Sequence, residues 1–223
     1  GRVWVWTDGE KPVAIGCVWS VVAVVAPSVR NITLEFHSLS DNNVRVQRNG
    51  AVEWQTHEPG IKWLDVADVG PPPMRESLLL TRMRAIARSN ASGKEAGIKG
   101  APAQKHRLLP QPILRYSDSV RKAVGAVFVY ADGTDPQVFL LLEAVGGKWK
   151  MAFARSNLRG LYVDRNAERI WASPRAEPFV RTNPFFIYFR AERRSASDPA
   201  EILAVAGQGD LRPALVEPSP TAP

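Results

Sequence analysis

Two stretches of the chain share one pattern of hydrophobic and polar positions. Residues 1–12 (GRVWVWTDGEKP) and 125–136 (GAVFVYADGTDP) are identical at six of twelve positions. In each stretch valine alternates with an aromatic residue, which is the period-two pattern of a β-strand with two different faces. An Asp-Gly pair follows, and glycine tolerates the positive φ that a tight reversal needs. The pattern predicts two β-hairpins, whose return strands are expected at residues 13–20 and 137–144.

The similarity between the two stretches continues beyond these hairpins. Residues 32–54 align without a gap to residues 149–171, and each segment contains an Arg-Asn pair that is typical of a second tight turn. The identical pairs are Phe36/Phe153, Val46/Val163, Arg48/Arg165, Asn49/Asn166 and Trp54/Trp171. Ordered identities at the same places relative to the turns indicate a tandem duplication rather than a chance likeness of hairpins.

A helical pattern occurs between the two copies. Three prolines at 71–73 stop the preceding sheet and favour a helix start. Leu79, Met83 and Ile86 then form an apolar stripe at helical spacing within residues 74–89, and the segment 90–93 (NASG) is expected to end the helix.

We therefore expect an α+β, mainly antiparallel β protein made of tandem-duplicated β-meander halves with one α-helix between them. The first β-rich repeat would span residues 1–70, and the absence of a counterpart to residues 108–124 before Gly1 suggests that it is trimmed at its N-terminus. The other expected parts are a helix with a basic flexible linker at 71–107, a second β-rich repeat at 108–194 that closes with a strand at 185–189, and a disordered tail at 195–223.

Composition excludes several classes of protein. No apolar run approaches the length that spans a bilayer as a helix. Cys17 is the single cysteine, so no intrachain disulfide and no cysteine-cluster metal site can form, and we expect Cys17 to be inert packing.

The net charge of +7 is concentrated in one zone of the chain. Residues 75–122 hold eleven basic and three acidic side chains, whereas the two flanking regions are close to neutral. Such a zone would attract an acidic macromolecule, which could be a polysaccharide, an anionic surface or a nucleic acid. The predicted anion-binding residues are Arg82, Arg84, Arg88, Lys94, Lys99 and Lys105. The alternative is a solvated helix face followed by a solubilising linker.

Aromatic residues suggest a second candidate surface. Trp4, Trp6 and Trp19 would form a flat platform for stacking against sugar rings if they lay on one face. Phe128 and Tyr130 would be the counterpart of this platform in the second repeat. The alternative, which we expect for all five residues, is that they fill the core between a sheet and a helix.

The sequence supports catalytic chemistry only weakly. It contains no nucleophile elbow and no phosphate-cradling glycine loop, and Cys17 lacks a basic neighbour. His37 with Asp41, and His57 with Glu58, match no known metal-ligand spacing, so the sequence predicts neither a metal nor a cofactor. Carboxylates are available for acid–base work, and they include Glu35, Asp41, Asp132, Asp135 and Glu143. The recurring Asp8 and Asp132 are explained by the hairpin turns that they occupy.

Several segments together resemble a group of bacterial hypothetical proteins to which no activity is assigned. The resemblance lies in LLPQPILRY (108–116) followed by GAVFVYADGTDPQVFLLLEA (125–144), in PPPMRESLLLTRMRAIARS (71–89) and in GRVWVWTDGEKPVAIG (1–16). Members of this group typically begin with a signal peptide, so the resemblance implies export to the periplasm or cell envelope. It implies no catalytic residues.

Our expectation for function is a non-catalytic binding protein whose basic zone at 75–122 contacts an acidic partner. The alternative is a hydrolase in which carboxylates or His37 converge between the two halves. A deep pocket with perturbed carboxylates would favour the hydrolase, and a groove flanked by Arg84 and Arg88 would favour the binding protein.

Overall fold

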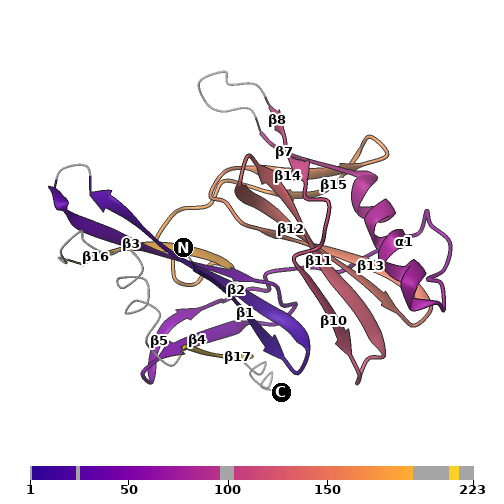
Figure 1. Cartoon of the computed structure of the whole chain (residues 1–223), viewed down its shortest axis with the longest axis horizontal. Helices are drawn as coiled ribbons and strands as arrows, with labels where there is room; N and C mark the ends of the chain where they lie inside the picture. The colour runs from indigo at the N-terminus through magenta and orange to yellow at the C-terminus, as the bar shows by residue number, and fades with distance from the viewer. Residues whose placement is uncertain (1, 24–25, 96–102, 193–210, 216–223) are drawn as a thin grey trace, which may run out of the picture. The chain divides into compact units, whose positions relative to one another are not determined.

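The structure is a computed structural model, and it describes residues 2–23, 26–95, 103–192 and 211–215 (Figure 1). The chain divides into two compact units. Unit 1 comprises Gly1–Asp8, Pro12–Gly60 and Pro178–Pro223, and unit 2 comprises Gly9–Lys11 and Ile61–Glu177. Both units are built from antiparallel strands, and the helix belongs to unit 2. The expected class, mainly antiparallel β with one helix in the middle of the chain, is therefore confirmed.

Unit 1 contains a four-stranded and a three-stranded sheet. The first has the order β1 (Arg2–Asp8), β2 (Lys11–Ala23), β3 (Ala26–Ser38) and β16 (Phe185–Glu192). The second has the order β17 (Leu211–Leu215), β4 (Val44–Arg48) and β5 (Ala51–Gln55). The first and last parts of the chain therefore meet in one unit, because β16 pairs along β3 and β17 pairs along β4.

Aromatic rings dominate the core of unit 1. Phe36 on β3 stacks against Trp6, Trp54 and Phe186, with ring centroids 6.1, 5.5 and 6.3 Å away. Trp54 is fully buried, and its Nε1 donates a hydrogen bond of 2.8 Å to the carbonyl oxygen of Asn183. Large rings bury much apolar area, and the indole N–H of Trp54 has a partner, so burial of this ring leaves no orphaned donor.

Unit 2 contains a six-stranded and a four-stranded sheet. The main path of the first runs through β10 (Leu114–Asp118), β11 (Ala123–Asp132), β12 (Asp135–Val145), β13 (Lys148–Arg155) and β6 (Leu64–Asp65), and β9 (Arg107–Leu108) pairs with β11. The second has the order β15 (Glu168–Ser173), β14 (Leu161–Arg165), β7 (Asn90–Lys94) and β8 (Gln104–Lys105).

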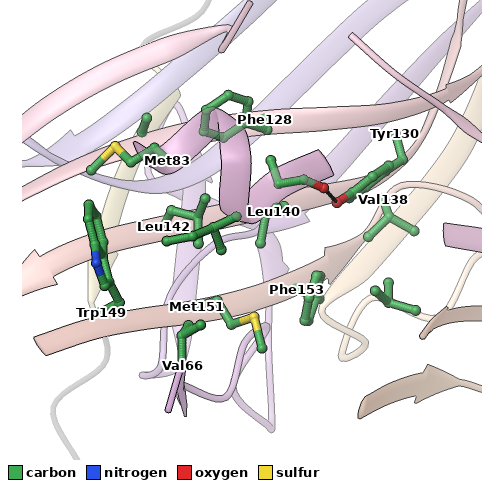
Figure 2. Packing of buried hydrophobic residues seen from close by; sticks show 14 of the residues in the cluster. Val66, Met83, Phe128, Tyr130, Val138, Leu140, Leu142, Trp149, Met151 and Phe153 are labelled. Atoms are coloured by element: carbon green, nitrogen blue, oxygen red, sulfur yellow. Dashed lines mark hydrogen bonds between the residues drawn. The ribbon is translucent and has the colours of Figure 1, made fainter. Parts of the chain in front are cut away.

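Helix α1 (Glu76–Arg88) covers one face of the β11–β12–β13 sheet. Its apolar stripe of Leu79, Met83, Ile86 and Ala87 is buried in the same cluster as Phe128 and Tyr130, which confirms the expected packing of these two aromatics between sheet and helix. Figure 2 shows Leu140 and Leu142 of β12, with Met83 of the helix to one side of them and Met151 and Phe153 of the adjacent strand β13 on the other. The Tyr130 hydroxyl donates a 2.7 Å hydrogen bond to the carbonyl oxygen of Ala87, so the ring anchors the end of the helix as well as filling the core (Figure 2).

The predicted hairpins form where the sequence places them. Gly9 and Gly133 have φ of 57° and 61°, in the left-handed region that glycine tolerates. Asn49 and Asn166 have φ of 50° and 52°, as expected for the second pair of turns. The return strands are β2 and β12, which include the predicted ranges.

Two expected non-strand segments form strands in the structure. The NASG segment was expected to end the helix and open a linker, but Asn90–Lys94 forms β7, paired along β14, and Gln104–Lys105 forms β8. Small polar residues have low strand propensity, but pairing with the open edge of β14 satisfies their backbone groups and overrides it. Residues 96–102 of the expected linker lie outside the described residues.

Other strands join a different unit from the one expected. The strand expected to close the second repeat is β16, and it pairs with β3 in unit 1. The short β6 precedes the helix, yet it pairs with β13 in unit 2. Within the expected disordered tail, Leu211–Leu215 forms β17, and the other residues of 195–223 lie outside the described part. Long-range pairing of this kind leaves no local signal in the sequence.

Candidate functional site

The outward side of α1 presents basic residues to solvent. Arg75 occupies the N-cap position, and Arg82 and Arg88 lie within the helix; all three are exposed. Arg75, Leu78 and Arg82 are spaced three and four residues apart, so they line one side of the helix. Leu78 keeps 47% of its surface exposed. Arg88, six residues after Arg82, lies about 120° further round the helix. We call Arg75, Leu78, Arg82 and Arg88 together the α1 outer face.

The three arginines of the α1 outer face make no ion pair within the described part of the chain. Arg88 lies in the last turn of the helix, where a cation is stabilised by the partial negative charge of the helix end. Arg75 and Arg82 have no such role, so their charges are directed at solvent.

Arg84, also predicted to bind anions, points elsewhere. It is half-buried, and its Nη2 donates a hydrogen bond to Oε1 of Gln111. Its Nε is buried, with no hydrogen-bond partner among the residues that the structure describes. Arg84 is therefore fixed against the segment before β10 and is separate from the α1 outer face.

The three lysines that were predicted to bind anions differ in their surroundings. Lys94 on β7 forms an ion pair of 3.1 Å with Oδ2 of Asp132, whose Oδ1 also accepts a hydrogen bond from Gln104. Lys105 on β8 is exposed, and Lys99 lies outside the described residues. The structure thus groups Arg82 with Arg88 on the helix, while Lys94 has an internal acidic partner.

Other basic side chains of the 75–122 zone also have partners. Arg115 pairs with Glu76 at 3.4 Å, with both side chains largely exposed. Arg121 bonds the fully buried Glu143 and contacts Asp118 at 3.7 Å. The formal charge of the zone therefore overstates what is available to a partner.

A buried polar cluster surrounds Glu143 on β12. The Tyr116 hydroxyl donates a 3.0 Å hydrogen bond to Glu143 Oε1, and Arg121 compensates the carboxylate charge. Gly125 makes room for this ring, because a Cβ there would lie 2.2 Å from Cζ of Tyr116. An open hollow of about 640 Å³ lies beside the cluster, with Glu76, Arg115, Tyr116 and Val124 in its lining.

The chemistry of this cluster is that of a satisfied buried network. Burial, reinforced by the nearby Glu143 carboxylate, raises the pKa of Tyr116 far above its usual value, so the phenol stays protonated and acts as a donor. A carboxylate that is paired and hydrogen-bonded in this way holds β10 against β12, and its oxygens are occupied. Tyr116 therefore lacks the near-neutral titration that general acid–base catalysis requires.

A serine–histidine contact links β7 to the segment before β9. Ser92 Oγ lies 2.9 Å from Nδ1 of His106, and both residues are buried. Desolvation lowers the pKa of His106, with Lys94 acting in the same direction and Asp132 opposing it. A nucleophilic serine needs access to substrate, and Ser92 is 2% exposed, so the contact is suited to joining two segments rather than to catalysis. The sequence carried no signal for this contact, because the strand that bears Ser92 was itself not predicted.

The lowered pKa of His106 predicts how the stability of the protein depends on pH. Unfolded histidine titrates near pH 6.5. As the pH falls below this value, the unfolded state takes up a proton more readily than the folded state. Neutral His106 therefore makes its full contribution to stability above about pH 6.5, and this contribution decreases as the pH falls toward the pKa of His106 in the folded state. We expect the free energy of unfolding to fall as the pH is lowered below about 6.5, and His106→Gln to reduce this fall. Denaturant unfolding of both proteins across this range measures the difference. An NMR titration in which His106 has a pKa at or above 6.5 would contradict the prediction.

The three tryptophans of the predicted platform are divided between two faces. Trp4 and Trp6 pack against the core of unit 1, and the ring of Trp6 lies over Gly16, whose Cβ it would otherwise contact at 2.3 Å. Trp19 pairs with Thr33 across β2 and β3, on the face opposite to the Gly16–Phe36 pair. Trp4 and Trp6 therefore share the core-facing side of the sheet, and Trp19 lies on the other.

The remaining candidate residues are dispersed. His37 is buried on β3, while Asp41, His57 and Glu58 are exposed. Asp132 and Asp135 flank the turn between β11 and β12, where Asp135 accepts a hydrogen bond of 2.7 Å from Gln137. His37 and Asp41, which the sequence suggested as a pair, thus differ in environment, and the structure instead brings His37 close to Glu35 and Cys17.

Comparisons with known proteins complete this description. No helix in the described part of the chain is long and apolar enough to cross a membrane. Comparison of the chain with models of protein families, with curated proteins and with solved structures finds no match.

Proposed function

We propose that this chain is a non-catalytic binding protein that contacts an acidic partner through the α1 outer face. The observation that carries the proposal is the exposure of Arg75, Arg82 and Arg88 on one helix, with no ion pair to any residue in the described ranges. The helix is itself held on the sheet by a buried stripe, so the arginines project from a rigid element.

The chemistry of the α1 outer face indicates the class of partner. Guanidinium groups form paired hydrogen bonds with carboxylate, sulfate-like and phosphate groups, and they are less strongly hydrated than ammonium groups. Leu78 lies between Arg75 and Arg82 along the helix, and Met74 just before it is fully exposed, so apolar contact accompanies the charge. The helix contains no aromatic residue for stacking on bases. These features support an acidic polymer or surface recognised by its charge rather than by base sequence.

The test compares binding by the wild-type chain with binding by Arg75→Gln/Arg82→Gln/Arg88→Gln. The matched control is Lys148→Gln/Arg159→Gln/Arg175→Gln, which removes the same charge from exposed positions elsewhere in unit 2. Fluorescence anisotropy is measured with a labelled single-stranded oligonucleotide, an acidic oligosaccharide and anionic vesicles. If three phosphates are neutralised on a single strand, affinity falls about 20-fold between 50 and 200 mM salt. We expect this salt dependence to disappear in the α1 variant and to persist in the control.

Two results would overturn the proposal. If the wild-type chain bound none of the probes at low salt, the charge of the α1 outer face would have no role in binding an acidic partner. Equal weakening by the α1 variant and by the control would mean that only net charge matters. Differences among the three probes would identify the partner class.

We infer in addition that the two units arose by tandem duplication. The first sheet of unit 1 has the order β1-β2-β3 with β16 next to β3, and the first sheet of unit 2 contains the equivalent order β11-β12-β13 with β6 next to β13. The second sheets also correspond, with the order β17-β4-β5 in unit 1 and β7-β14-β15 in unit 2. The identical pairs Phe36/Phe153 and Trp54/Trp171 also occupy equivalent contacts, since the ring centroids are 5.5 Å apart in unit 1 and 5.8 Å apart in unit 2. In an experimental structure, we expect superposition of β1–β5 on β11–β15 to bring these two pairs into register. An offset of one residue would contradict a common origin.

A further inference from the structure

Three metal-ligating side chains of unit 1 lie together on one face of the β2–β3 pair. Cys17 on β2 is directly opposite Glu35 on β3 in the antiparallel register. His37 follows two residues after Glu35, so alternation along the strand places it on the same face. This face is opposite to the one that contributes Leu34 and Phe36 to the core of unit 1.

The distances within the cluster fit a single bound ion. The ligand atoms of Cys17, Glu35 and His37 all lie within 4.8 Å of one another. His37 Nε2 is 3.5 Å from Oε2 of Glu35. In a tetrahedral zinc site with metal–ligand distances near 2.1 Å, nitrogen and oxygen ligands are separated by about 3.4 Å. The histidine–carboxylate pair therefore already has the separation that a shared ion requires, and the Cys17 sulfur needs only a small side-chain adjustment.

Packing fixes the histidine and leaves the other two ligands reachable. His37 is 1% exposed, and its ring stacks on Phe185 of β16 with centroids 5.0 Å apart and an interplanar angle of 27°. The Glu35 side chain is 16% exposed and Cys17 is half-buried. The fixed imidazole of His37 defines the direction from which an ion is bound. The partly exposed thiol and carboxylate can adjust, and they leave a path by which the ion enters.

A buried hydroxyl on the same face is a second, independent observation. Thr33 precedes Glu35 by two residues, so it lies on the side of β3 that carries the cluster. It is fully buried, and its Oγ1 has no hydrogen-bond partner among the described residues. An unpaired buried hydroxyl is unfavourable, and metal-binding carboxylates are commonly oriented by such a donor. A Glu35 carboxylate bound to an ion offers a hydrogen-bond acceptor on the same face as this hydroxyl.

We propose that Cys17, Glu35 and His37 bind one divalent transition-metal ion of the Zn²⁺ class. Thiolate and imidazole ligands favour Zn²⁺ over Mg²⁺ and Ca²⁺, which prefer oxygen ligands alone. Thiolate and carboxylate together balance the charge of the ion, and Thr33 orients Glu35. Three protein ligands leave the fourth position for water or for a group of a partner molecule. The inference is independent of the α1 outer face, which lies in unit 2.

The test uses the full chain, reduced and treated with a chelator, then titrated with Co²⁺ and afterwards with Zn²⁺. We expect one Co²⁺ per chain, with a near-ultraviolet sulfur-to-cobalt charge-transfer band that Zn²⁺ abolishes. Zn²⁺ should also slow the reaction of Cys17, the single thiol, with a thiol reagent, and should raise the melting temperature. Cys17→Ala is expected to abolish the charge-transfer band, and His37→Gln to weaken binding by more than about 100-fold.

Two further variants separate a built site from incidental binding. Thr33→Val should weaken Zn²⁺ binding by about 10-fold or more, as loss of an orienting hydrogen bond does elsewhere. His57→Gln/Glu58→Gln removes the other neighbouring histidine–carboxylate pair, which is exposed, and should leave binding unchanged. Far-ultraviolet circular dichroism reports whether each variant is folded.

The proposal is overturned if the wild-type chain shows no charge-transfer band with Co²⁺ and no protection of Cys17 by Zn²⁺. These two measurements need no variant, so they remain decisive if a substitution prevents folding. Glu35 and His37 would then form an ordinary side-chain contact beside a packed cysteine.

Discussion

Phe36→Ala is expected to lower the free energy of unfolding by about 3 to 5 kcal/mol, the range observed when a buried aromatic ring is deleted. Phe36 is 1% exposed, and its ring lies at the centre of the stack formed by Trp6, Trp54 and Phe186. Deletion removes contacts with three rings at once, and the strands on both sides of β3 prevent the space from closing. Denaturant unfolding followed by tryptophan fluorescence measures the change.

The matched control for this substitution is Phe179→Ala. Phe179 loses the same atoms but is 54% exposed, so the expected change is below about 1 kcal/mol. If the two units unfold in separate transitions, the effect of Phe36→Ala belongs to the transition of unit 1. Equal effects of the two substitutions would contradict the assignment of Phe36 to the centre of the core.

Arg165→Met is expected to destabilise unit 2 by about 2 to 4 kcal/mol, because each buried acceptor left without a donor costs about 1 to 3 kcal/mol. Arg165 is 6% exposed, and its guanidinium donates to Asp68, to the Asn90 side chain and to the carbonyl oxygen of Ile86 in the last turn of α1. Methionine keeps most of the apolar stem but offers no donor. The substitution therefore removes the side-chain hydrogen bonds that link β14 to the helix end, to Asn90 of β7 and to the loop before the helix, while the backbone pairing of β7 with β14 remains. Denaturant unfolding measures the loss of stability.

Two measurements distinguish this network from an ordinary surface ion pair. Arg115→Met removes an exposed pair with Glu76 and is expected to change stability by less than about 1 kcal/mol. The hydrogen bond from Arg165 holds the pKa of Asp68 below its usual value, so its stabilising contribution is present above about pH 4 and is lost as the pH falls further. In Arg165→Met the pKa of Asp68, measured by NMR, should return toward its ordinary value. An unchanged pKa would contradict the role given to Arg165.

The parts of the fold that were predictable from sequence are those with local causes. Gly9, Asn49, Gly133 and Asn166 each adopt the positive φ that their turns require. In β1 the alternation separates the exposed Val3 and Val5 from Trp4 and Trp6, which pack against the core. In β11 and β12 both faces are buried, so the alternation there does not identify one core face. The stripe of Leu79, Met83 and Ile86 likewise predicted the face of α1 that is buried. In these segments, pattern and turn chemistry agree, and nothing distant is needed to decide the structure.

The remaining elements depend on partners that are distant in sequence. Asn90–Lys94 has a composition that is typical of a loop, yet it forms a strand because β14 presents an unpaired edge. For β16 the strand itself was predictable, but its pairing with β3 was not, since a strand of bulky apolar residues suits either sheet. The same applies to Cys17, Glu35 and His37, whose proximity follows from the β2–β3 register and not from a spaced motif.

The charged zone shows a different limit of sequence reasoning. Counting charges identified residues 75–122, but it did not indicate that Lys94 and Arg121 face Asp132 and Glu143. Ion pairs between distant segments are invisible to composition. Among the described residues, the exposed basic side chains without an ion pair therefore form a smaller set than the count suggests.

The division of unit 1 into segments at both ends of the chain has a consequence for synthesis. β16 leaves the ribosome after all of residues 61–177, so unit 2 can finish folding while β3 still has an unpaired edge. During this interval the nascent chain exposes the backbone edge of β3 and lacks the Phe186 ring that packs on Phe36. An unpaired strand edge of this kind promotes association between chains. A chaperone that shields this edge, or slow translation after residue 177, would therefore affect the yield of folded protein more than any delay within unit 2.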